Sequence, residues 1–181
     1  MNKGRKVIFL DLETQKTFQE VGGRHNLSRL GLAAAVTYNS SSEEYHSYTE
    51  DEVEGLVEEL AGADLVVGFN VKSFDYEVLR PYTDYPLHTI PTADMLQDVY
   101  QELGFRLSLD SLAQATLGIG KSADGLQAVR WFRQGRLDKV IEYCRRDVEV
   151  TRKLYEYGCE RGYILYWDRR GRMQKIFVGW S

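Results

Sequence analysis

Residues 7–14 read VIFLDLET, an apolar run that leads into two acidic residues, Asp11 and Glu13. Consecutive apolar residues of this kind predict a short buried strand over residues 7–10. Because strand side chains alternate between the two faces, Asp11 and Glu13 are expected on the same face. Two neighbouring carboxylates repel each other unless a cation lies between them, and Mg²⁺ or Mn²⁺ prefers such oxygen ligands. Alone, however, an Asp-x-Glu pair is common, and two solvated acids at a strand end are the simpler interpretation.

A second pattern lies at residues 66–75, which read VVGFNVKSFD. A buried strand runs into Gly68 and Asn70, and Asp75 falls in the first turn of a helix predicted over 73–79. The structural alternative is that Asn70 is a turn or cap residue and that Asp75 is stabilised by the helix dipole. Each residue alone fits either interpretation.

The third pattern is Tyr143 followed four residues later by Asp147, on a helix predicted over 137–159. Residues four apart share a helix face, one turn from each other. A tyrosine that hydrogen-bonds a water beside a metal-bound aspartate makes chemical sense. A core tyrosine and a solvated aspartate near Arg146 is the better explanation of this pattern in isolation.

The three patterns together, in this order, resemble the DEDD superfamily of 3′→5′ exonucleases, which have a ribonuclease H-like fold. The resemblance covers roughly residues 7–157. Position 142 is Glu and position 143 is Tyr, so the chain looks like the tyrosine (DEDDy) branch rather than the histidine branch. The family's metal-binding carboxylates are matched by Asp11, Glu13, Asp75 and Asp147.

This resemblance implies hydrolysis of the terminal phosphodiester at a 3′ end, preferably of single-stranded DNA, with release of nucleoside 5′-monophosphates. Two divalent metal ions, Mg²⁺ or Mn²⁺, are implied as cofactors. Asp11 would bridge them, Glu13 and Asp147 would complete the water-activating site, and Asp75 would support the second ion. Tyr143 would orient the water, since a pKa near ~10 makes it a poor base at neutral pH. The predicted substrate-binding residues are Leu12, Thr14, Asn70, Arg145 and Arg146.

The predicted fold class is α/β: a ribonuclease H-like mixed sheet, with an antiparallel meander first and parallel strands after it, flanked by helices. Predicted strands cover 7–10, 30–38, 44–49 and 65–67, and predicted helices cover 51–60, 73–79, 95–103, 109–117, 125–132 and 137–159. A terminal hairpin is predicted from 163–167 and 175–180. We therefore expect an exonuclease domain over residues 1–162 and a hairpin appendage over 163–181. Asp94, at the start of a predicted helix, is left out of the acidic site.

Composition is consistent with one folded domain, since 43% of the 181 residues are apolar and 28% are charged. The net charge of −4 excludes a uniformly basic nucleic-acid-binding protein. Residues 1–100 contain 8 Lys or Arg and 17 Asp or Glu, whereas residues 101–181 contain 15 and 10. An acidic part and a basic part suit a protein that holds metal ions against a polyanion.

The sequence predicts a cytoplasmic protein without membrane contact. The apolar run before Asp11 is too short for a signal-peptide core, and no run approaches the ~18–20 residues of a membrane helix. Cys144 and Cys159, if they share the last long helix, lie about 22 Å apart, too far for a disulfide. Two reduced thiols are therefore expected.

Two alternatives stay open at this point. One is an RNA-specific 3′→5′ exoribonuclease, because no residue decides the sugar. The other is a non-catalytic exonuclease-like module that binds nucleic acid, although none of the matched carboxylates is lost. The hairpin combines basic residues with Tyr166, Trp167 and Trp180, which suits single-stranded nucleic acid but also packing against the domain, a second subunit or a partner protein. Its basic residues are Arg169, Arg170, Arg172 and Lys175.

Overall fold

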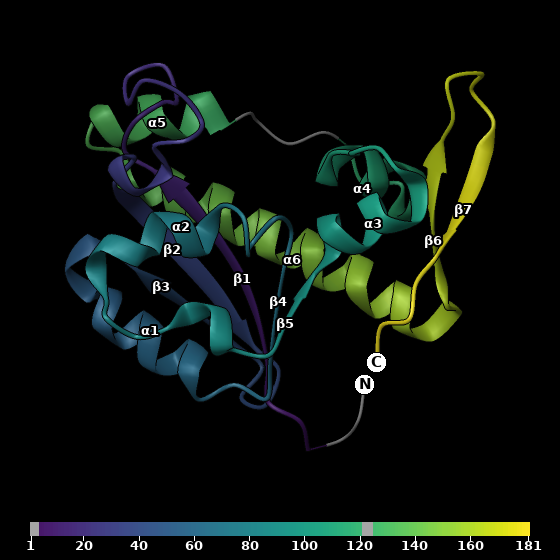
Figure 1. Cartoon of the computed structure of the whole chain (residues 1–181), viewed down its shortest axis with the longest axis horizontal. Helices are drawn as coiled ribbons and strands as arrows, with labels where there is room; N and C mark the ends of the chain where they lie inside the picture. Colours follow the sequence, from purple (N-terminus) through teal and green to yellow (C-terminus); the bar gives the residue numbers. More distant parts are fainter. Residues whose placement is uncertain (1–3, 121–124) are drawn as a thin grey trace.

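A computed structural model of the chain describes residues 4–120 and 125–181. A five-stranded sheet in the order β3-β2-β1-β4-β5 has helices on both faces (Figure 1). A separate two-stranded sheet, β6-β7, lies at the end of the molecule away from edge strand β3. The first three strands form an antiparallel meander, and β1, β4 and β5 run parallel. The predicted mixed sheet with a C-terminal hairpin is therefore confirmed.

The central strand is β1 (Val7–Thr14), which pairs differently with its two neighbours. It pairs with antiparallel β2 (Leu32–Asn39) along its length up to Thr14, whereas its pairing with β4 (Leu65–Gly68) ends at Phe9. Pairing with β2 explains why the strand continues through the acidic residues instead of ending at residue 10. The edge strands are β3 (Glu44–Tyr48) and β5 (Thr92–Asp94).

Helices α1 (Val53–Ala61) and α2 (Asp75–Leu79) cover one face of the sheet. The other face is covered by α3 (Met95–Leu103), α4 (Leu109–Leu117) and the long α6 (Leu137–Arg161), with α5 (Gly125–Arg133) beside α6. Short 3₁₀ turns occupy Leu27–Arg29, Glu50–Glu52, Arg80–Tyr82 and Leu87–Thr89. The predicted helix at 51–60 thus begins as a 3₁₀ turn, and the one at 73–79 begins at residue 75.

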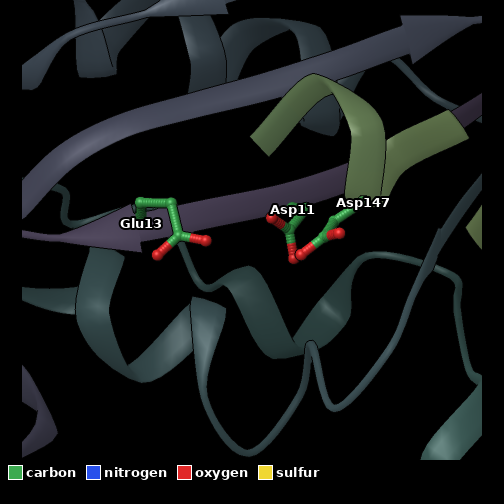
Figure 2. Close-up of side chains that lie close together, drawn as sticks. All are labelled: Asp11, Glu13 and Asp147. Atoms are coloured by element: carbon green, nitrogen blue, oxygen red, sulfur yellow. The ribbon is translucent and has the colours of Figure 1, made fainter. Parts of the chain in front are cut away.

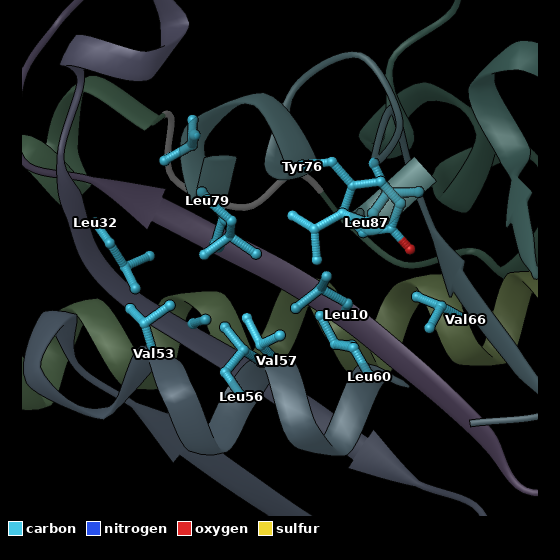
Figure 3. Packing of buried hydrophobic residues seen from close by; sticks show 14 of the residues in the cluster. Leu10, Leu32, Val53, Leu56, Val57, Leu60, Val66, Tyr76, Leu79 and Leu87 are labelled. Atoms are coloured by element: carbon cyan, nitrogen blue, oxygen red, sulfur yellow. The ribbon is translucent and has the colours of Figure 1, made fainter. Parts of the chain in front are cut away.

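Alternation along β1 divides its side chains between two apolar cores. Ile8, Leu10 and Leu12 pack against α1 and α2. Figure 3 shows Leu10 facing Leu60 of α1. Val7 and Phe9 belong to the second core, with α3, α4 and α6. Asp11 and Glu13 continue this second column, so the strand directs them toward α6.

The hairpin of β6 (Tyr163–Trp167) and β7 (Met173–Phe177) is packed onto the domain. Ile164 and Ile176 are fully buried in the second core, and Thr116 of α4 accepts a hydrogen bond at 2.9 Å from the backbone N–H of Leu165. The predicted second strand at 175–180 is wrong at both ends. The chain beyond β7 leaves the strand instead, and Trp180 stacks on Tyr155 of α6 with ring centroids 5.3 Å apart.

Among the described residues, no helix combines the length and the apolar character needed to cross a bilayer.

Candidate active site

Three carboxylates converge where the middle of β1 meets α6 (Figure 2). Asp11 and Glu13 come from β1 and Asp147 from α6, and one oxygen of each lies within 4.8 Å of the others. In Figure 2 the carboxylates of Asp11 and Asp147 point toward one another, and Glu13 lies one alternation further along the strand. We call these three residues the carboxylate cluster.

Asp75 approaches the cluster from α2 and is buried, with 4% of its surface exposed. Because β4 stops pairing with β1 at Phe9, the edge of β1 near Leu12 is open on this side. The Asp75 carboxylate accepts backbone hydrogen bonds at Leu12 and at its own residue, which lower its pKa, but burial outweighs them and raises that pKa well above its usual value. The negative charge of Asp75 in turn raises the pKa values of Asp11 and Glu13, so the four predicted metal ligands act on each other electrostatically.

The surroundings of the cluster disfavour its negative charge. Burial raises the pKa of Asp11 well above its usual value, and the charges of Asp147, Glu13 and Asp75 raise it further. The pKa of Glu13 is raised by burial and then by Asp147 and Asp75. Mutual repulsion of this kind is relieved when a cation enters the site.

The donor set fits a hard divalent ion. All the converging atoms are carboxylate oxygens, which suit Mg²⁺ or Mn²⁺ better than a soft metal. Asp11, Glu13, Asp147 and the neighbouring Asp75 are thus the residues that would hold such ions.

Cys144 of α6 contacts Asp11 and was not predicted as part of the site. Its thiol is fully buried and donates to the Asp11 carbonyl at 3.1 Å and to Asp11 Oδ2 at 3.3 Å. The second contact lowers the pKa of Asp11, against the larger effects of burial and charge. The one available signal was its position beside Tyr143 on the predicted helix.

Tyr143 lies one turn before Asp147 on α6, as its spacing predicted. Its ring packs edge-on against Trp131 of α5, with centroids 6.2 Å apart. Trp131 is a second neighbour that the motif did not reveal, since α5 precedes α6 as a separate helix.

Asn70 occupies the bend between β4 and α2 in the left-handed region, with φ of 71°. Its backbone N–H donates to Asp94 Oδ1 at 2.9 Å, and its Oδ1 accepts from Arg106 Nη2 at 2.8 Å. Asp94 also accepts from Lys72 N–H at 3.0 Å and caps α3 through Leu96 and Gln97. Asp94 is thus occupied as a backbone acceptor and helix cap, and its exclusion from the acidic site stays a prediction. The contact of Arg106, in the loop between α3 and α4, with Asn70 had no local signal in the sequence.

A cavity of about 480 Å³ adjoins Asp11 and Glu13. Leu12 and Thr14, two of the predicted substrate-binding residues, line it, although Leu12 is mostly buried and the Thr14 hydroxyl donates to the Lys16 carbonyl at 3.0 Å. Phe18 and Phe74 add aromatic surface, with ring centroids 6.0 Å apart.

Arg145 and Arg146 line a different cavity of about 620 Å³, next to Tyr143. The guanidinium of Arg145 lies 4.3 Å above the ring of Tyr45 on β3, and Arg146 Nη2 donates to the carbonyl of Gly120 at 3.4 Å. Both side chains are exposed, and their contact with a substrate stays a prediction.

A family model described as the RNase_H superfamily matches residues 8–159, from β1 almost to the end of α6, and this range includes the carboxylate cluster, Asp75 and Tyr143. A search of curated proteins found no match.

Proposed function

Because the chain belongs to the RNase_H superfamily, whose members are generally nucleases that use divalent metals, we propose that it is a 3′→5′ exonuclease of the DEDDy type. The observation that carries the proposal is the convergence of Asp11, Glu13 and Asp147 within 4.8 Å, with Tyr143 one turn before Asp147. The substrate is the 3′ end of single-stranded nucleic acid, and the products are nucleoside 5′-monophosphates.

The carboxylate cluster and Asp75 would hold the Mg²⁺ or Mn²⁺ ions. Bound ions of this kind acidify a coordinated water and offset the charge that develops on the phosphate and on the leaving 3′ oxygen. The chain contributes rigidity: Asp11 and Glu13 are fixed by paired β1, and Asp147 by a helix packed across the sheet. Preorganised ligands of this kind need little rearrangement when the substrate binds.

Tyr143 would orient the attacking water through its hydroxyl, which both donates and accepts hydrogen bonds. Trp131 supports this role by limiting the positions that the Tyr143 ring can adopt. Trp131 is thus a positioning residue rather than a group that touches substrate.

The terminal nucleotide would occupy the cavity beside Asp11 and Glu13. Leu12 and Thr14 line that cavity, and Phe18 and Phe74 offer ring surface for a base. Asn70, held in its bend by Asp94 and Arg106, would bind the substrate close to the scissile bond.

The test is digestion of 5′-labelled single- and double-stranded DNA and RNA with Mg²⁺, with Mn²⁺ or with EDTA. Stepwise shortening from the 3′ end with release of 5′-monophosphates, dependent on metal and lost in Asp11→Asn, is expected. Glu54→Gln, which changes an exposed acid on α1, is the matched control and should retain activity. Unimpaired cleavage by Asp11→Asn would overturn the assignment, and failure to cut any substrate would favour a non-catalytic binding module.

A further inference from the structure

A further cleft, of about 640 Å³, lies between the loop joining α3 to α4 and the tip of the β6–β7 hairpin. Phe105 and Arg106 line it from the loop, and residues 166–170 and Arg172 line it from the hairpin. Its volume is within the range of pockets that hold small ligands, about 300–1,000 Å³. We call this feature the hairpin cleft.

Two aromatic rings at the hairpin cleft, those of Phe105 and Trp167, are largely exposed, whereas Tyr166 beside them packs partly against the second core. Phe105 is 46% exposed and Trp167 is 50% exposed. Phe105 packs edge-on against Tyr166 with ring centroids 6.1 Å apart, and this contact limits the positions that the exposed Phe105 ring can adopt. Exposed rings at a concave surface offer flat faces on which unpaired bases stack.

The charge of the hairpin cleft is positive, although the chain as a whole is acidic. Its lining holds Arg106, Arg169, Arg170 and Arg172 against one acid, Asp168. The Asp168 carboxylate is already bound by the side chain of Arg172 at 2.9 Å and by the backbone N–H of Arg170 at 2.8 Å. Among the described residues, no side chain pairs with the guanidinium of Arg169 or Arg170, so both are available to phosphates.

Arg106 joins the hairpin cleft to the candidate active site. Its Nη2 donates to Asn70 Oδ1, and Asn70 stands in the bend that leads to Asp75. Arg106 thus places one positive charge between Asn70 and the hairpin cleft, where a strand with its 3′ end at the carboxylate cluster could meet it.

We propose that the hairpin cleft binds the part of a single-stranded nucleic acid that lies upstream of its 3′ end. This rests on the proposed function, which places the 3′ end at the carboxylate cluster. Arg169 and Arg170, whose guanidinium groups lack side-chain partners among the described residues, bind the phosphates, and the exposed rings of Phe105 and Trp167 stack the bases. A duplex fits less well because its bases are already stacked and paired.

The test is equilibrium binding of a 5′-fluorescein oligothymidylate of about 20 nucleotides, measured by anisotropy in EDTA so that no hydrolysis occurs. The double variant Arg169→Glu/Arg170→Glu is expected to bind at least about tenfold more weakly. Its affinity should also depend less steeply on salt, by roughly 0.7 in the logarithmic slope for each phosphate that the variant no longer binds. Trp167→Ala should weaken binding by about five- to tenfold. Arg80→Glu, an exposed arginine on the other side of the sheet, is the matched control and should bind like the wild type.

Each outcome separates this proposal from the proposed function. Unchanged affinity in the double variant, or no binding by the wild type, overturns the hairpin cleft as a nucleic-acid site whatever the hydrolysis assay gives. Weaker binding by the variant supports the cleft, and if the wild type then hydrolyses nothing with Mg²⁺ or Mn²⁺, only the proposed function fails. A dimer that the double variant dissociates, with DNA affinity unchanged, identifies a second copy of the chain as the occupant and overturns the proposal. Circular dichroism checks that the exposed substitutions leave the fold intact.

Discussion

Asp75 and Asp94 are two buried aspartates that stand at the starts of neighbouring helices, with 4% and 2% of their surfaces exposed. Asp94 accepts hydrogen bonds from the backbone N–H groups of Asn70, Lys72, Leu96 and Gln97. Asp75 accepts from its own backbone and from Leu12, yet burial, and to a smaller extent the charge of Asp94, raise its pKa well above the usual value. An acid surrounded by donors supports the fold, whereas an acid that faces other acids is set up to bind something positive.

Glu59 of α1 is a third buried acid with which Asp75 and Asp94 can be compared. Its carboxylate accepts hydrogen bonds from Thr37 Oγ1 at 2.5 Å and Tyr48 OH at 3.0 Å, and pairs with His46 Nδ1 at 2.9 Å. These contacts join α1 to β2 and β3. Burial and then the charge of Glu59 raise the pKa of the Tyr48 hydroxyl, which keeps it protonated as a donor. Glu59, also a mostly buried acid, therefore resembles Asp94: its carboxylate is surrounded by hydrogen-bond donors rather than by other acids.

The largest expected effect is on the acids that face each other. Asp11→Asn removes a charge from the centre of the carboxylate cluster, and hydrolysis should fall by about 10²–10³-fold or more. The fold should persist, because the substitution also relieves repulsion from Asp147 and Glu13. Single-turnover kinetics together with a urea denaturation curve measure both quantities. A variant that is unfolded, or fully active, would remove the distinction between the two kinds of acid.

The opposite result is expected at Asp94. Asp94→Ala leaves backbone N–H groups at Asn70, Lys72 and the start of α3 without their acceptor, which should cost about 2–4 kcal/mol of folding free energy. Urea denaturation measures this cost directly. A stability equal to that of Asp11→Asn would show that Asp94 is not the structural acid that its contacts indicate.

A smaller effect is expected from pH in the absence of metal. The folded protein binds protons on Asp11, Glu13 and Asp75 at higher pH than the unfolded chain does, because their pKa values are raised. Stability in EDTA should therefore fall as the pH rises from the ordinary carboxylate range near about 4 through these raised values. Mg²⁺ should restore it, and more strongly at alkaline than at acidic pH. Thermal denaturation across this range gives the slope, and the double variant Asp11→Asn/Glu13→Gln, as the control, should flatten it.

The smallest effect is expected at Cys144, whose thiol donates to Asp11 of the carboxylate cluster. Cys144→Ala removes the thiol hydrogen bonds to Asp11, and kcat should fall by less than about tenfold, since S–H is a weak donor. Cys144→Ser supplies a stronger donor and should recover part of the activity. A titration of Mg²⁺ against activity distinguishes this positioning role from a general decrease in stability, because only the former shifts the metal dependence.

Much of the fold was predictable because local signals agree with it. Both α3 and α4 have the predicted bounds, since Asp94 and Ser108 cap their N-termini and Gly104 and Gly118 adopt the left-handed conformation that ends them. The extent of β1 was not predictable, because pairing with β2 rather than apolar composition carries it to Thr14. The last strand was misplaced because Trp180, which looks like a strand aromatic, donates its indole N–H to Asp98 instead.

In the candidate site, too, local sequence patterns predicted some features, and others depend on contacts between distant segments. Alternation predicted that Asp11 and Glu13 share a face, and helix spacing placed Tyr143 beside Asp147. Cys144 and Arg106 were missed because their contacts with Asp11 and Asn70 span 133 and 36 residues of sequence. Such contacts depend on tertiary packing, which no local pattern encodes.

The short β4 has a consequence for anyone who redesigns this sheet. Pairing between β1 and β4 ends at Phe9 and Val67, and at Gly68 an added Cβ would meet Val71 Cβ at 2.7 Å, so the chain bends away there. A β4 lengthened by two residues would satisfy more backbone hydrogen bonds and look like a better sheet. It would also occupy the edge of β1 from which Asp75 reaches the carboxylate cluster. The incomplete pairing of β1 with β4 therefore constrains any redesign: a longer β4 should give a more stable protein in which Asp75 no longer lies beside the carboxylate cluster.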